Sequence, residues 1–296
     1  MRSRVTRVAL YASPFVLAAL AALAYFSLAP RNSAAQTGSV QVAGSETMRA
    51  VVTACAEDFM ARNPKADVIV KGGGSGDGIA AMLHGIVDIG MMSRDLTQRE
   101  RDFAQSKGIV LSISDFGLDG ITIVVDRSNA IADLTLDQLQ GIFAGKIRNW
   151  RELGGTDAEI LPFARAAGSG TASMFDDRVL HGGPYGPGIQ RLSTNEAIVS
   201  DVAKQAGAIG YASLGALRTG GERIRIVPLR IAPDEQAVAP TADAVRAGRY
   251  PLIRVLHLAT PGRPTGATKA FLDFCTGAAA QPLLQNAGYV SLAPAQ

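Results

Sequence analysis

One junction rich in glycine and hydroxyl side chains carries the residues best suited to chemistry, and that chemistry is anion binding. Arg165 follows an apolar segment predicted as a strand over 159–164, and residues 168–171 (GSGT) then open an amphipathic helix. The first turn of a helix has unpaired backbone N–H groups and a partial positive charge. Arginine adds a planar fork of donors that matches a tetrahedral oxyanion. An ordinary connection with a serine cap has the same pattern, so this junction alone does not decide.

A second junction of the same kind lies near the start of the folded region. A short strand predicted over 39–43 leads into residues 44–48 (GSETM) and a helix over 49–62. Thr47 is placed to cap that helix. We expect the hydroxyl of Ser45 and the N–H groups around it to face whatever lies beyond the strand end.

A third junction is a run of glycines at 72–78 (GGGSGDG). It follows a buried strand predicted over 66–70 and precedes a helix predicted over 79–84, with Ser75 supplying a hydroxyl at the helix start. A flexible glycine linker is the simpler interpretation. It is weakened because a strand and a helix flank the run directly, without polar low-complexity sequence.

These loops do not fit the common enzyme motifs. A nucleophile elbow needs glycine two residues after its serine, but Asp77 follows Ser75 and Thr171 follows Ser169 at that spacing. Residues 141–146 lack the spacing of a phosphate-binding loop of the Walker type. The three histidines are isolated from one another and from the two cysteines. The sequence therefore predicts no catalytic triad, no metal site and no cofactor site, so no enzyme.

The elements that must position these junctions alternate between strand and helix. A further strand predicted over 87–92 ends in Ser93 and Arg94, and another is predicted over 121–125. This alternation is typical of α/β folds with parallel sheets, whose ligands bind beyond the carboxyl ends of the strands. We therefore expect the three junctions to converge on one cleft.

Composition and charge limit the class of protein. The chain has 296 residues, of which 47% are hydrophobic and 19% charged, enough for one large or two ordinary globular domains. It has 29 basic and 26 acidic residues, but four of the arginines lie within residues 1–35, which contain no acid. The remainder is close to neutral, so a nucleic-acid partner has no support from composition.

The basic N-terminus has the pattern of an export signal. Arginines precede an apolar run over 8–28, and small residues at 33–35 form a plausible cleavage site. The run is also long enough to span a bilayer, so residues 1–35 are predicted to be a signal peptide or an uncleaved membrane anchor. Either outcome places the folded region outside the cytoplasm, because the arginines stay inside.

The two cysteines, Cys55 and Cys275, lie near opposite ends of the folded region. In an oxidising compartment they can pair as a disulfide. Each also lies in a helical pattern in which a small buried residue would serve as well. The sequence leaves both interpretations open.

Several segments together resemble the phosphate-binding proteins of bacterial phosphate ABC importers. The segments are GSETM, GGGSGDGIAAMLHGIVDIGMMSR, LDGITIVVDRSNAIADLTLDQLQGIFAGKIRNW, RAAGSGT, STNEAIVSDVAKQAGAIGYAS and NAGYVSL, in order along nearly all of the mature chain. The resemblance implies a type II periplasmic-binding-protein fold, in which two α/β lobes are joined by two crossing strands with the ligand cleft between them. Lobe 1 would comprise residues 36–120 and 253–296, and lobe 2 residues 121–252.

The resemblance also implies a set of ligand-binding residues. Proteins of this family bind dehydrated phosphate through hydroxyls, backbone N–H groups and one arginine. The positions that match the family's motifs are Ser45, Thr47, the N–H of Met48, Ser75, Arg165, Ser169, Gly170 and Thr171.

The chain departs from the family at one position. Members with the best-known selectivity place an aspartate where Ser93 stands here. That aspartate accepts the proton of hydrogen phosphate and rejects sulfate, which has no proton to give. Its absence puts the preference for phosphate over sulfate in doubt, although Asp77 or Asp119 could supply an acceptor from another direction.

Arg94, directly after Ser93, has two interpretations. It could be a second ligand of the anion, so Ser93 and Arg94 complete the predicted binding set. Alternatively it forms a surface ion pair with Asp95 or Glu100, as arginines beside acidic residues commonly do.

The resemblance implies a function without covalent chemistry. The protein would be a periplasmic monomer that captures inorganic phosphate in the interlobe cleft and delivers it to the membrane subunits of an ABC permease. Membrane contact would occur only through the permease or an uncleaved N-terminal segment. An alternative is a membrane-tethered sensor or scaffold module of the same fold that binds phosphate or another oxyanion, favoured if the first 30 residues are never cleaved. A phosphoryl-transfer enzyme is disfavoured because the base and metal ligands are missing.

Overall fold

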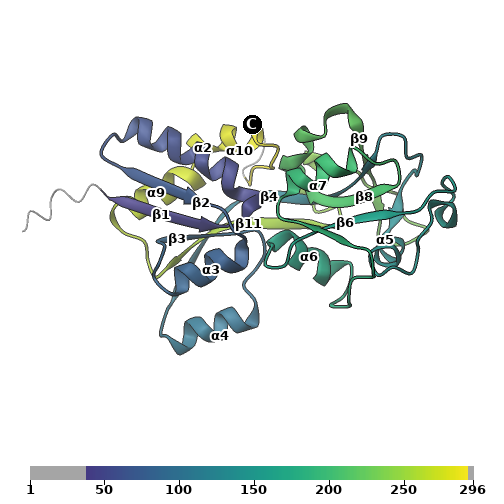
Figure 1. The fold of residues 1–296 in the computed structure, drawn as a ribbon. Coiled ribbons are helices and arrows are strands. Elements are labelled where there is room, and N and C mark those ends of the chain that lie inside the picture. Colours follow the sequence, from purple (N-terminus) through teal and green to yellow (C-terminus); the bar gives the residue numbers. More distant parts are fainter. Residues whose placement is uncertain (1–37, 293–296) are drawn as a thin grey trace, which may run out of the picture. The chain divides into compact units, whose positions relative to one another are not determined.

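A computed structural model describes residues 38–292, and the predicted export signal or anchor at 1–35 lies outside these residues (Figure 1). Within 38–292 the chain forms one nine-stranded sheet in the order β2-β1-β3-β11-β4-β8-β6-β7, with β9 paired to β4. None of the helices in this part of the chain is long and apolar enough to cross a membrane.

The first half of the sheet consists of β2, β1, β3, β11 and β4 up to Gly120. Its strands are β1 (Ser39–Gly44), β2 (Asp67–Lys71), β3 (Ile89–Met92), β4 (Leu111–Asp126) and β11 (Ile253–Pro261). Its helices are α2 (Glu46–Arg62), α3 (Ser75–Leu83), α4 (Gln98–Ser106), α9 (Gly266–Thr276), η4 (Ala278–Ala280) and α10 (Gln281–Asn286). Helices α2 and α9 cover one face and α3 and α4 the other (Figure 1).

The second half consists of β4 from Ile121 onward, β8, β9, β6 and β7. Its strands are β6 (Leu161–Arg165), β7 (Gln190–Leu192), β8 (Ala208–Ser213) and β9 (Ile224–Val227), and a small separate sheet pairs β5 (Leu134–Thr135) with β10 (Leu229–Arg230). Its helices are α5 (Leu136–Phe143), η1 (Trp150–Leu153), α6 (Gly170–Arg178), α7 (Asn195–Val202), η2 (Leu214–Thr219), η3 (Gly221–Arg223) and α8 (Ala242–Arg246). Helix α7 covers one face, and α5 and α6 the other (Figure 1).

Strand β4 runs through both halves. It pairs with β11 as far as Gly120 and with β8 from Ile121 onward. Its residues from Asp119 to Val125 are buried without interruption, which explains why the sequence shows an apolar run there instead of alternation. The proposed assignment of 36–120 with 253–296 to one lobe and 121–252 to the other stays a prediction.

The expectation of parallel pairing is correct only in part. Strands β1, β2 and β3 pair in parallel, as do β6, β7 and β8. Strand β11 is antiparallel to β3 and β4, and β4 is antiparallel to β8 and β9. The alternation rule applies to strands joined by a crossover helix, whereas β4 and β11 carry the chain from one half to the other.

Two helices begin earlier than predicted, and this matters for the site. The helix expected over 49–62 begins at Glu46, and the helix expected over 79–84 begins at Ser75. Glycine and serine lower helix propensity, so the sequence pattern placed these residues in loops. In the structure they form the first turns, and their N–H groups therefore lie at the helix ends.

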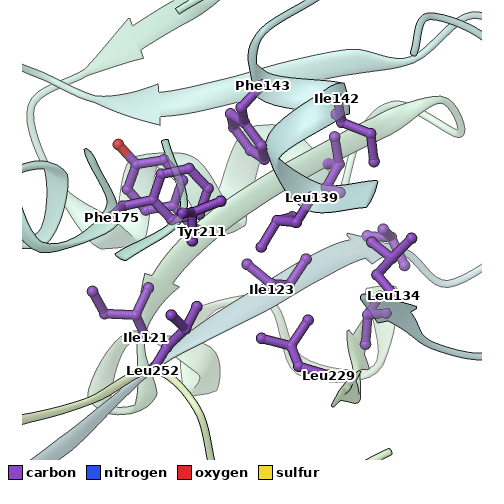
Figure 2. Packing of buried hydrophobic residues seen from close by; sticks show 14 of the residues in the cluster. Ile121, Ile123, Leu134, Leu139, Ile142, Phe143, Phe175, Tyr211, Leu229 and Leu252 are labelled. Atoms are coloured by element: carbon purple, nitrogen blue, oxygen red, sulfur yellow. The ribbon is translucent and has the colours of Figure 1, made fainter. Parts of the chain in front are cut away.

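The two halves have separate hydrophobic cores. The core of the second half packs α5 and α6 against β4 and β8, with the ring of Phe175 stacked on Tyr211 at 3.9 Å (Figure 2). In the first half, Phe59 of α2 meets Phe271 of α9 edge to face. Each fully buried side chain of this size contributes about 1.5–3 kcal/mol of hydrophobic stabilisation. Each half is therefore stabilised by its own core.

Both cysteines lie in the core of the first half, where α2 packs against α9. Cys55 and Cys275 are completely buried and are free thiols in the structure. Burial, followed by its contact with Cys55, raises the pKa of the Cys275 thiol.

We expect both thiols to react with a disulfide reagent at least ~100-fold more slowly in the folded protein than in denaturant, because reaction requires unfolding. The measurement is the absorbance change on adding 5,5′-dithiobis(2-nitrobenzoic acid) with and without guanidinium chloride. Equal rates in the two conditions, or no thiol detected in denaturant, would contradict the buried dithiol.

Candidate functional site

Hydroxyl groups from both halves of the sheet meet at the seam between them. Ser45 Oγ donates to Ser93 Oγ at 2.8 Å, and Ser75 Oγ lies 3.2 Å from Ser93 Oγ. Thr47 Oγ1 lies 3.1 Å from Thr171 Oγ1, which comes from the second half. All five residues are buried. This hydroxyl cluster (Ser45, Thr47, Ser75, Ser93, Thr171) can turn its protons toward an anion without any change of charge on the protein.

Three helices begin beside the hydroxyl cluster. Helix α2 begins at Glu46, α3 at Ser75 and α6 at Gly170. Helix N-termini supply backbone donors and a positive potential, so their convergence favours an anion. The prediction that Thr47 caps α2 is wrong: Ser45 occupies the N-cap position, and Thr47 lies in the first turn with its hydroxyl in the cluster.

Three further predicted residues lie at these helix starts. Ser169 caps α6, and its Oγ accepts from the N–H groups of Thr171 and Ala172 at 3.2 and 3.4 Å. The N–H of Met48 donates to the carbonyl of Ser45 at 3.0 Å, and its side chain lies in the core. Gly170 lies against Ser75 and Ser93.

Two glycines permit the close approach of backbone at the seam. A Cβ on Gly44 would lie 2.3 Å from the carbonyl oxygen of Met91, and its φ of +139° suits glycine alone. A Cβ on Gly170 would lie 2.4 Å from Ser75 Oγ and 2.5 Å from Ser93 Oγ. Gly170 therefore lets the start of α6 touch the hydroxyls of the opposite half.

Arg165 is a buried cation beside the hydroxyl cluster. Its Nη1 donates to Asn195 Oδ1 and its Nη2 to the carbonyl of Ser193, both at 2.6 Å, while its Nε is buried without a partner. Asn195 in turn donates to Thr47 Oγ1 at 3.0 Å. No carboxylate of residues 38–292 lies within ion-pair distance of Arg165. Burial, and then the nearby charge of Arg254, lowers the pKa of Arg165 to about 10.

Arg254 is a second buried cation that the sequence analysis missed. Its Nη1 donates to Thr171 Oγ1 at 3.0 Å and its Nη2 to Thr47 Oγ1 at 3.3 Å, so one guanidinium contacts hydroxyls of both halves. It also donates to the carbonyl of Ser93. The available signal was an arginine in the mostly apolar run 252–259 of a predicted strand, in which His257 is the other polar residue. A charge at such a position needs a buried partner or a ligand.

Asp119 is that partner. It faces Arg254 across the β4–β11 pair, and its Oδ2 accepts from Arg254 Nη2 at 2.6 Å and Nε at 2.8 Å. Its Oδ1 accepts from Ser213 Oγ and from the N–H of Leu214. Burial raises the pKa of Asp119, and the Arg254 charge opposes that effect. Both carboxylate oxygens are therefore engaged away from the hydroxyl cluster, and Asp77, the other acceptor considered, is exposed.

Arg94 forms an ion pair, and its partner is Glu100. The two Nη groups donate to the two carboxylate oxygens of Glu100 at 2.7 and 2.8 Å, and Nη1 also contacts the carbonyl of Asp95. Burial is the largest single effect and would raise the pKa of Glu100, but the hydrogen bonds from Arg94 and Thr97 and the charge of Arg94 together outweigh it, so the pKa is lowered. In this structure the guanidinium is held by a carboxylate, and its role as an anion ligand stays a prediction.

The chain is similar to known proteins over most of its length. Residues 29–279 match a family model described as PBP superfamily domain. The "Phosphate-binding protein PstS" of Bacillus subtilis is 34% identical over 255 residues, an alignment that covers 86% of this chain and 81% of that protein.

Solved structures show the same architecture. A structure described as a putative phosphate ABC transporter substrate-binding protein with bound phosphate, from Clostridium perfringens, has a TM-score of 0.77 at 29% identity and covers 86% of this chain and 100% of its own. An ABC-type phosphate transport receptor from Vibrio cholerae has a TM-score of 0.71 at 29% identity, over 85% of this chain and 99% of its own. The likeness thus extends far beyond the loops of the seam.

Proposed function

The chain belongs to the PBP superfamily and has the type II fold of its PstS-like phosphate-binding proteins, and from this premise we propose that it captures inorganic phosphate at the seam between the two halves of its sheet. The proposed ligands are the hydroxyl cluster, the N–H groups at the starts of α2, α3 and α6, and Arg165. Ser169, Gly170 and Met48 belong to these helix starts. The supporting relatives are those whose names state that they bind or carry phosphate.

The observation that carries the proposal is the buried, uncompensated guanidinium of Arg165. A charge with only neutral hydrogen-bond partners in a dry site costs several kcal/mol of folding free energy. Such a cost is offset when an anion binds and forms charge-assisted hydrogen bonds, which are stronger than neutral ones. Three converging helix N-termini act in the same direction. The site is therefore suited to a small anion with many acceptor oxygens, as inorganic phosphate is.

Binding would proceed by closure of the two halves. The hydroxyls of Ser45, Thr47, Ser75 and Ser93 come from the first half, and Arg165 and Thr171 from the second. An anion captured by one half gains the donors of the other only when the halves approach, so the bound anion favours the closed arrangement. No covalent step enters this mechanism.

The proposal extends to transport. The protein would be exported through residues 1–35, act in the periplasm as a monomer, and deliver phosphate to the membrane subunits of an ABC permease, which would recognise its closed form. The two lobes that move would be 36–120 with 253–296, and 121–252. If 8–28 is not cleaved, that segment would hold the protein to the inner membrane.

The test is a calorimetric titration of the purified protein with inorganic phosphate, after dialysis to remove any anion bound during expression. We expect saturable binding of one phosphate per chain. Phosphate esters serve as the comparison. The hydroxyl cluster is buried and would surround all the oxygens of a bound phosphate, so an ester, which has an organic group on one oxygen, should bind far more weakly. Absence of any phosphate binding would refute the proposal.

A further inference from the structure

Two buried arginines and one buried carboxylate share the seam. Arg254 donates to Thr47 Oγ1, and Asn195, which accepts from Arg165, donates to the same oxygen. Both are at least 95% buried, and Asp119 is completely buried. Water therefore screens these charges weakly, and their sum determines how strongly the seam attracts anions of different charge.

Asp119 is connected to the hydroxyl cluster through a single residue, Arg254. Its carboxylate holds Arg254 by two hydrogen bonds, and the same guanidinium contacts Thr47 Oγ1 and Thr171 Oγ1. Its other oxygen is fixed by Ser213 and the N–H of Leu214. The negative charge is thus held at a constant place behind a cation that touches both halves.

We propose that Asp119 is a specificity-determining residue: by cancelling one of the two arginine charges, it limits the preference of the seam for doubly over singly charged tetrahedral anions. This inference rests on the proposed binding of an anion at the seam. The positive potential of the helix N-termini also favours the dianion, but it is the same in every variant compared. The Coulomb repulsion between a carboxylate and a dianion is twice that between the carboxylate and a monoanion at the same place. The carboxylate therefore lowers the ratio of dianion to monoanion affinity.

Among the residues that the structure describes, Glu46 and Glu196 also act on Arg165, but both are present in every variant compared and so do not alter the difference between variants. The hydrogen-bond partners of Asp119 are Arg254, Ser213 and the N–H of Leu214. The nearby phenols are those of Tyr250 and Tyr289, and burial raises the pKa of both far above neutrality. The charge behind the seam is therefore that of the Asp119–Arg254 pair.

The experiment compares the full-length protein with Asp119→Asn by calorimetry. Phosphate is titrated at an acidic pH, where it has one charge, and at an alkaline pH, where it has two. Sulfate has two charges at both pH values, so its affinity at each pH corrects for effects of pH on the protein. The readout is the ratio of dianion to monoanion affinity after this correction. We expect the ratio to rise about tenfold in Asp119→Asn.

If Asp119 had a purely structural role, Asp119→Asn would lower all affinities by the same factor and leave the ratio unchanged. This result would overturn the inference. Ser213→Ala is the matched control, because it removes one hydrogen bond to Asp119 but no charge, and its ratio should equal that of the parent. If the parent itself binds neither phosphate nor sulfate, the proposed function fails instead, so the two failures are distinguishable.

A second pair of variants covers the case in which Asp119→Asn does not fold. Arg254→Gln removes the partner charge, and the ratio should fall about tenfold below that of the parent. Adding Asp119→Asn to Arg254→Gln leaves no unpaired buried charge in the pair, which favours folding. The ratio should then return to that of the parent. A double variant that matches Arg254→Gln would overturn the inference.

Discussion

Replacing Arg165 by methionine should weaken phosphate binding strongly while leaving the free protein at least as stable as the parent. Truncating one partner of a buried charge pair costs about 2–5 kcal/mol of binding free energy, or ~30-fold to several thousand-fold in affinity. In the free protein the same guanidinium has only neutral partners and one buried nitrogen without any. Methionine is of similar length and needs no partner, so unfolding should not become easier.

Two measurements check this expectation. Calorimetry gives the affinity, and thermal unfolding with and without phosphate gives the stability and its linkage to the ligand. The control is Arg151→Met, which removes an arginine whose side chain is 66% exposed and paired with Asp157 at the surface. That variant should bind phosphate as the parent does. An Arg165→Met protein that keeps the parent affinity would remove Arg165 from the site.

Adding a single methyl group at Gly170 should weaken phosphate binding by up to ~100-fold, because forcing an extra methyl into a packed contact costs about 1–3 kcal/mol. Its Cβ would lie within 2.5 Å of both Ser75 Oγ and Ser93 Oγ, which belong to the opposite half. The backbone at Gly170 is helical, so alanine is compatible with α6 itself. The clash therefore arises only when the two halves meet.

Gly76→Ala is the matched control for Gly170→Ala. Gly76 also lies at the seam, but a Cβ there would find its nearest neighbours at 3.7–3.9 Å, which is ordinary contact. We expect its affinity to stay within a few-fold of the parent. Small-angle X-ray scattering with saturating phosphate should show Gly170→Ala more extended than Gly76→Ala. Equal compactness and equal affinity of the two would show that the halves do not close on Gly170.

The sequence was informative about local features and about the convergence of the loops. The strand-to-helix junctions with Ser45, Ser75 and Arg165 do meet at one place, because strands β1, β2 and β6 end at the same seam. Helix starts were predicted too late, since glycine and serine at 72–78 read as loop by propensity alone. Tertiary contacts decide such boundaries, and here the first turns pack against the opposite half.

The pairing of Arg254 with Asp119 could not be found by reading along the chain. The two residues are far apart in sequence and become neighbours only through the register of β4 and β11. The pattern of alternating strand and helix favoured parallel strands and gave no register for an antiparallel pair. Asn195, which links Arg165 to Thr47, was missed for the same reason, because nothing local marks a buried amide.

The position of β11 between β3 and β4 has a consequence for the order in which the protein acquires its structure. Strand β11 is near the end of the chain, yet it lies in the middle of the first half and pairs with both neighbours. During synthesis, β1, β2 and β3 emerge long before the strand that completes their sheet. Until β11 arrives, the edge of β3 is an unpaired template, which is a known route to aggregation. The N-terminal part of the chain therefore completes its folding last, after the second half has been made.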